Sequence, residues 1–81
     1  MSKTYIYILQ SLKNGRKYVG VTNCIETRLD RHNAGRVVPT KKDAPYDLIY
    51  SEVFSDLKSA RRREKFLKFG DGRRVLKSLV S

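Results

Sequence analysis

The sequence predicts an α+β fold in which a small three-stranded antiparallel sheet is flanked by helices, in the order β-β-α-β-α-α. Two aromatic and β-branched segments on either side of an Asn-Gly pair indicate a β-hairpin. Two long segments with apolar residues at helical spacing indicate amphipathic helices, with a third strand between them. The chain has 81 residues, so we expect a single domain over residues 1–81.

The predicted hairpin joins TYIYILQS, which begins at Thr4, to KYVGVT, which begins at Lys17. Successive side chains of a strand point to opposite faces of the sheet. Tyr7 and Tyr18 therefore share one face. The other face carries the residues that we expect to form the core, which are Ile6, Ile8, Val19 and Val21.

Asn14-Gly15 predicts a two-residue type I′ turn, which requires positive φ at both positions. This turn sets Tyr7 opposite Thr22, and Gly20 then leaves a gap between the two tyrosines. Their offset along the strands would be roughly 13 Å of backbone rise.

The segment after the hairpin predicts a helix that begins at Asn23 as N-cap, with Glu26 completing a capping box. Gly35 is expected to end this helix. Arg28 and His32 are four residues apart and so share one helical face. Residues 36–45 are expected to form a polar, basic loop, and residues 46–54 a third strand.

The second long helix is capped by Ser55 or Asp56 and ends at Gly70. Its predicted apolar face carries Glu64 in line with Leu57, Ala60 and Leu67. An unpaired carboxylate aimed at a core costs several kcal/mol. A structural ion pair of Glu64 with Arg28 or a neighbouring arginine would offset this cost. A last helix follows Asp71, with Val75, Leu76, Leu79 and Val80 as its apolar residues.

The charge balance favours a polyanionic partner. Lys and Arg number 18 against 8 Asp and Glu, which gives a formal net charge of +10. Nucleic acids and anionic membranes are the usual partners of such a field, although a charge that serves only solubility is also compatible with it. No apolar run approaches the roughly 20 residues of a membrane span. The single cysteine suits a reducing compartment, so we expect a cytoplasmic protein. We expect nucleic acid, and not a membrane, as its partner.

Five features of the sequence, in order, resemble the GIY-YIG nuclease superfamily. They are YIY at Tyr5–Tyr7, YVG at Tyr18–Gly20, Arg28, His32 and Glu64. The resemblance covers nearly the whole chain and is closest to the small stand-alone bacterial members. Two departures stand out: Tyr5 occupies the place of the first glycine, and no asparagine follows Asn33, whereas many nucleases of the superfamily carry one near the domain end.

The resemblance implies an endonuclease that hydrolyses DNA phosphodiester bonds with one divalent metal ion, Mg²⁺ or Mn²⁺. Glu64 would anchor the metal, and Arg28 would bind phosphate oxygens. Tyr7 would act as base or orient the water, which requires cations to lower its pKa, while Tyr18 would position the water or phosphate and His32 would assist proton transfer.

The residues expected to contact nucleic acid are basic and lie in loops or on helix faces: Lys17, Arg31, Lys41, Lys42, Arg61 and Lys65. A lone catalytic domain with basic loops reads backbone and shape rather than bases. We therefore expect selection of branched or nicked DNA structures, with RNA also open. The missing asparagine favours an alternative, a nucleic-acid-binding module with weak or no catalysis, and the charge alone is also compatible with an RNA- or ribosome-associated protein.

Overall fold

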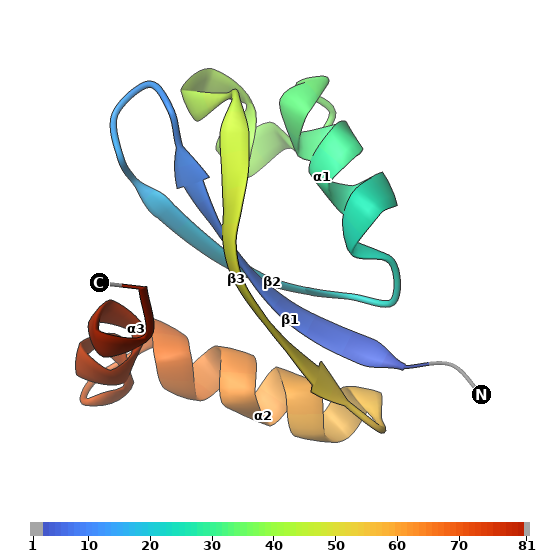
Figure 1. Ribbon diagram of the computed structural model, residues 1–81, viewed down its shortest axis with the longest axis vertical. Coiled ribbons are helices and arrows are strands. Elements are labelled where there is room, and N and C mark those ends of the chain that lie inside the picture. The colour runs from blue at the N-terminus through green and yellow to red at the C-terminus, as the bar shows by residue number, and fades with distance from the viewer. Residues whose placement is uncertain (1–2, 81) are drawn as a thin grey trace.

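The computed structural model describes residues 3–80, with side chains described outside residues 38–40. Its three strands form one antiparallel sheet in the order β2-β1-β3, with bounds β1 Thr4–Ser11, β2 Lys17–Thr22 and β3 Tyr46–Phe54. One helix, α1 (Ile25–Asn33), covers one face, whereas α2 (Leu57–Lys68) and α3 (Gly72–Val80) cover the other (Figure 1). This arrangement confirms the predicted α+β fold.

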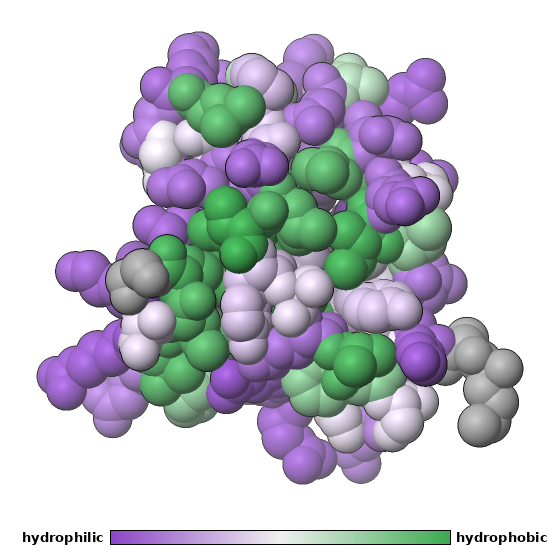
Figure 2. Space-filling view, in the orientation of Figure 1, coloured by the Kyte–Doolittle hydropathy of each residue, from purple (hydrophilic) through white to green (hydrophobic). Residues whose placement is uncertain are grey.

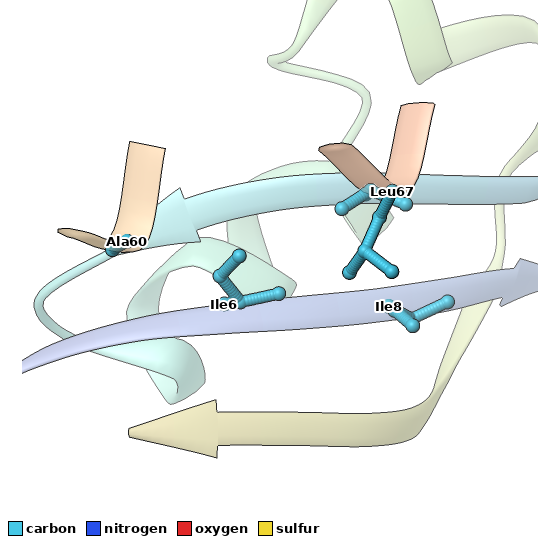
Figure 3. Packing of buried hydrophobic residues seen from close by; sticks show 5 residues of the cluster. Ile6, Ile8, Ala60 and Leu67 are labelled. Carbon is cyan, nitrogen blue, oxygen red and sulfur yellow. The ribbon is translucent and has the colours of Figure 1, made fainter. Parts of the chain in front are cut away.

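The core between the sheet and helices α2 and α3 is built from the predicted face of the hairpin. Ile6, Ile8 and Val19 pack with Ala60 and Leu67 of α2 in one buried cluster (Figure 3). Each such aliphatic side chain contributes about 1.5–3 kcal/mol on burial. The apolar residues predicted for the last helix, Val75, Leu76, Leu79 and Val80, pack against the same cluster.

Helix α2 begins as predicted at Asp56, whose Oδ1 accepts a hydrogen bond from the Ser59 backbone N–H at 2.7 Å. The predicted apolar face is wrong at Leu57, which is 50% exposed, because the buried part of the helix begins one turn later at Ala60. Hydrophobic side chains also remain at the surface over β3 and α3 (Figure 2). Within residues 3–80, the helices lack the length and apolarity needed to cross a bilayer.

The hairpin register differs from the prediction. Tyr7 pairs with Gly20, not with Thr22, which lies opposite Tyr5. The loop is longer than two residues, because the Ser11 N–H donates to the Arg16 carbonyl at 2.8 Å. Among the described residues only glycines have positive φ, so Asn14 does not adopt the type I′ conformation. Ser11 Oγ instead accepts hydrogen bonds from the backbone N–H groups of Lys13 and Asn14, at 3.1 and 3.2 Å.

The ends of α1 confirm one prediction and correct another. Gly35, at a φ of 74°, ends the helix as expected, and its N–H donates to the His32 carbonyl at 3.1 Å. The N-cap is Cys24 rather than Asn23. The hydroxyl of Thr22 competes for this position, because Thr22 Oγ1 accepts the Cys24 N–H at 3.1 Å. The segment expected to be a loop contains a short 3-10 helix, η1, over Val38–Asp43.

Candidate active site

The hairpin brings Tyr7 and Tyr18 together on the face covered by α1. Tyr7 lies opposite Gly20, and a Cβ atom at Gly20 would overlap the Cζ and Oη atoms of the Tyr7 ring. The phenol therefore lies directly over the glycine backbone. Because the register is shifted by two residues, Tyr18 lies nearer to Tyr7 than predicted, and their ring centroids are 6.2 Å apart.

Helix α1 places two side chains on the Tyr7 hydroxyl. Arg28 Nε donates to Tyr7 Oη at 3.3 Å, and His32 Nε2 lies 3.1 Å from the same oxygen. The spacing of four residues puts both side chains on the helix face that packs on the sheet. The Arg28 N–H donates to the oxygen, and the phenol proton can point at His32 Nε2 in the imidazole tautomer that carries its proton on Nδ1. Three of the five predicted catalytic residues thus meet at this hydroxyl, Tyr7, Arg28 and His32, and a fourth, Tyr18, packs its ring beside those of Tyr7 and His32.

Three aromatic rings enclose His32, which is fully buried. Its ring centroid lies 4.9 Å from that of Tyr18 and 5.9 Å from those of Tyr7 and Tyr46. Tyr46 is held against α1 by Asn33, whose Oδ1 accepts the Tyr46 N–H at 2.6 Å and whose Nδ2 donates to the Tyr46 carbonyl at 3.3 Å. The imidazole consequently has a fixed position beneath the Tyr7 hydroxyl.

Burial is the largest influence on the pKa values of Tyr7 and His32. It raises the pKa of Tyr7 above its usual value of 10.0, and the Arg28 hydrogen bond only partly offsets this effect. The requirement that neighbouring cations lower the pKa of Tyr7 is therefore not met in this arrangement, because desolvation outweighs the effect of Arg28. Burial and the Arg28 charge lower the pKa of His32 below 6.5. At neutral pH the phenol and the imidazole are both uncharged.

Glu64 lies at the edge of this centre and comes from the opposite helix layer. Its carboxylate is paired with Lys68 Nζ at 3.1 Å and, more distantly, with Arg61 at 3.9 Å. The predicted pairing with a neighbouring arginine thus holds for Arg61, and the strongest partner is a lysine. The Glu64 charge contributes to the raised pKa of Tyr7. Lys68 connects the two regions, because its Nζ also lies 5.8 Å from the Tyr18 ring centroid.

Sequence reasoning missed Lys68 and Tyr46 as members of the site. Lys68 carried a usable signal, because it lies four residues after Glu64 on a helix and so faces it. Tyr46 carried none, since its contact with His32 depends on how η1 returns the chain to the sheet.

A cleft of about 240 Å³ opens beside Arg28, at the start of α1. Its lining includes Arg31, one of the residues expected to contact nucleic acid, together with Thr22, Asn23, Cys24 and Thr27. The other five such residues are exposed: Lys17, Lys41, Lys42, Arg61 and Lys65. They lie on β2, η1 and α2, whereas Arg31 lies on α1.

Residues 3–73 match the GIY-YIG catalytic domain. The chain belongs to the GIY-YIG family. It is 38% identical to a UPF0213 protein of Staphylococcus haemolyticus, over 98% of this chain and 96% of that protein. A UPF0213 protein of Staphylococcus saprophyticus is 37% identical over 95% of this chain and 94% of its own length.

The fold also resembles the solution NMR structure of a UPF0213 protein from Bacillus halodurans. The TM-score is 0.56 at 29% identity, and the alignment covers 95% of this chain and 84% of that structure. These relatives support membership in the GIY-YIG family and match the chain over nearly all of its residues. GIY-YIG domains are nuclease domains and act on nucleic acids, and GIY-YIG nucleases generally use a divalent metal ion.

The residues of this GIY-YIG domain fit a weakly held, hard divalent cation. Within the described part of the chain, no three His, Cys, Asp or Glu side chains are grouped as metal ligands. A single carboxylate nevertheless suffices for Mg²⁺, which keeps several waters and takes its remaining oxygens from substrate phosphates. Glu64, whose side chain is 17% exposed, carries the carboxylate that the sequence-based prediction assigned to such an ion.

Proposed function

We propose that this protein is a divalent-metal-dependent endonuclease that hydrolyses DNA phosphodiester bonds and selects its substrate by structure. The observation that carries the proposal is the Tyr7 hydroxyl, which lies 3.1 Å from His32 Nε2 and 3.3 Å from Arg28 Nε. A hydroxyl between a neutral acceptor and a fixed cation is suited to proton transfer. Membership in the family supports the reaction class, and the two hydrogen bonds support the roles that we propose.

In the proposed reaction Tyr7 relays a proton. Attacking water gives a proton to Tyr7 Oη as the phenol proton passes to the neutral His32 Nε2. The water oxygen forms a bond to phosphorus, and the bond from phosphorus to the leaving oxygen breaks. That oxygen takes a proton from solvent, and His32 then releases its proton to restore the site. The lowered pKa of His32 favours this release.

Arg28 stabilises negative charge at two places in this scheme. Its hydrogen bond to Tyr7 Oη keeps it beside the hydroxyl, and this bond is the main cause of its raised pKa, so the guanidinium remains charged. Its remaining donors are available to phosphate oxygens in the adjoining cleft. Tyr18, which is only half-buried, positions the water or the phosphate on the open side of Tyr7.

Glu64 would hold the divalent ion, which would neutralise charge on the phosphate and the leaving oxygen. In the protein without a bound ion or DNA, this carboxylate forms ion pairs with Lys68 and Arg61. They screen its charge from an approaching phosphate, and they are exposed enough to move when an ion binds.

A second candidate function is DNA binding without hydrolysis. Two observations favour it: the Tyr7 side chain is only 1% exposed, and Glu64 is already paired with Lys68. In this alternative the Tyr7 centre is a buried polar cluster that stabilises the hairpin against α1.

Cleavage assays separate the two functions. Branched, nicked and single-stranded DNA are incubated with the protein in Mg²⁺, in Mn²⁺ and in a chelator, alongside Arg28→Ala purified identically. We expect metal-dependent cleavage of branched or nicked DNA by the natural protein and loss of that activity in the variant. DNA binding without cleavage of any substrate would contradict the proposed hydrolysis, as would equal cleavage by the variant.

A further inference from the structure

A second basic surface lies beside the hairpin, away from the Tyr7 hydroxyl. The hairpin loop and α3 lie on the same side of the molecule (Figure 1). Between them is a cleft of about 610 Å³. Its lining consists of Leu76 and five basic residues, Arg16, Lys17, Arg73, Arg74 and Lys77.

The cations of this cleft have no acidic partners in the described part of the chain. The ion pairs among the described residues lie outside the cleft and join Arg61 and Lys68 to Glu64, and Arg63 to Glu52. All five cleft cations are exposed. Like charges gathered around one hollow repel each other, and a ligand with several regularly spaced negative charges relieves that repulsion.

The α3 side of the cleft is fixed to the fold and is not a loose basic tail. Gly72 begins α3 in direct contact with the Phe66 carbonyl of α2, where a Cβ atom would overlap the oxygen. Leu76 packs against the central core. These two contacts hold the positive charges of α3 at a set position relative to β2.

The cleft adjoins the candidate active site along the outer edge of β2. Lys17, which lines the cleft, directly precedes Tyr18 in the strand, so the two Cα atoms are about 3.3 Å apart along the strand axis and their side chains face opposite sides. No further strand covers this edge, because the described sheet order is β2-β1-β3. Lys68 Nζ, 5.8 Å from the Tyr18 ring centroid, adds a further cation beside this strand.

We propose that this cleft binds the sugar-phosphate backbone of the DNA strand on one side of the bond positioned at Tyr7. The proposal rests on the proposed function and identifies where the substrate extends beyond the reacting phosphate. Lysine and arginine contacts of this kind add affinity without reading base sequence. They therefore suit a protein that recognises DNA by structure.

The test compares two triple variants that remove the same charge. Arg73→Gln, Arg74→Gln and Lys77→Gln alter the cleft, and Lys3→Gln, Lys58→Gln and Arg62→Gln alter exposed cations outside it. Affinity for a labelled nicked duplex is measured by fluorescence anisotropy between low and moderate salt. We expect the slope of log K against log salt concentration to decrease in magnitude by roughly 2–3 in the cleft variant and by less than about 1 in the control. At 100 mM salt, the cleft variant should lose on the order of 10- to 100-fold in affinity.

A second measurement separates this inference from the proposed function. Bis(4-nitrophenyl) phosphate is too small to occupy the cleft and the Tyr7 site together, so its metal-dependent hydrolysis should be equal in the cleft variant and the control. Arg16→Gln with Lys17→Gln provides an independent cleft variant, which should weaken DNA binding in the same way. Equal slopes for cleft and control variants, in a protein that binds and cleaves DNA, would overturn the cleft assignment alone. Absence of DNA binding by the natural protein would overturn the cleft assignment and the proposed function together.

Discussion

The Tyr7 phenol lies directly over Gly20, at the facing position of the neighbouring strand. The lack of a side chain at Gly20 leaves the space in which the hydroxyl reaches Arg28 and His32. Tyr7 is almost completely buried, so its ring has little room to move. The glycine of the YVG segment thus positions the tyrosine of the YIY segment.

Gly20→Ala should displace the Tyr7 ring from its two hydrogen-bond partners. We expect destabilisation of about 1–3 kcal/mol from overpacking, and loss of DNA cleavage if Tyr7 acts as proposed. Urea unfolding measures the first effect and single-turnover cleavage the second. Combining Gly20→Ala with Tyr7→Leu should recover part of the stability, because the smaller side chain removes the overlap. Additive effects of the two changes would show that the ring and the glycine are not coupled.

Protonation of His32 should destabilise the fold at acidic pH. Its pKa is lowered in the folded protein, so the unfolded chain binds more protons below about pH 6.5. Its contribution to stability is therefore complete above pH 6.5 and is lost as the pH falls from there through the folded pKa, with a slope of at most about 1.4 kcal/mol per pH unit. Urea unfolding between pH 7.5 and 5 measures this slope. His32→Gln should flatten it over this range, and an identical slope in the variant would assign the effect to other groups.

Glu64→Gln should change stability little, because the partners of Glu64 are exposed and remain hydrated after the pair is broken. Lys68 and Arg61 have side-chain exposures of 39% and 66%. We expect a loss of at most about 1 kcal/mol, with DNA binding kept and metal-dependent cleavage abolished. Glu26→Gln, an exposed carboxylate in the first turn of α1, is the matched control. Full cleavage activity in Glu64→Gln would remove this residue from metal binding.

Alternation along the strands predicted the faces of the hairpin but not its register. A shift of two residues leaves every side chain on its face, so the core of Ile6, Ile8 and Val19 is the same in both registers. The register instead depends on the loop, where Ser11 Oγ binds two backbone N–H groups and overrides the Asn14-Gly15 signal.

The membership of the site was predictable only in part. Helical spacing placed Arg28 and His32 on one face of α1. Alternation along the strands placed Tyr7 and Tyr18 together on one face of the sheet, and these two pairs of side chains meet in the structure. The complete burial of His32 was not predictable, because it depends on Tyr46, which arrives from a distant strand. The direction of the pKa shift of Tyr7 was not predictable either, since desolvation is a property of the packed structure.

The role of the Tyr7 hydroxyl is tested most directly by single-turnover cleavage of nicked or branched DNA by Tyr7→Phe in saturating Mg²⁺. Phenylalanine keeps the ring over Gly20 and removes only the hydroxyl, and Tyr5→Phe on the same strand is the control. We predict a loss in rate of about 10²–10⁴-fold for Tyr7→Phe, as expected for removal of a proton-transfer group, and a rate within a few-fold of the natural protein for the control. A Tyr7→Phe rate equal to that of the natural protein would contradict the role assigned to this hydroxyl.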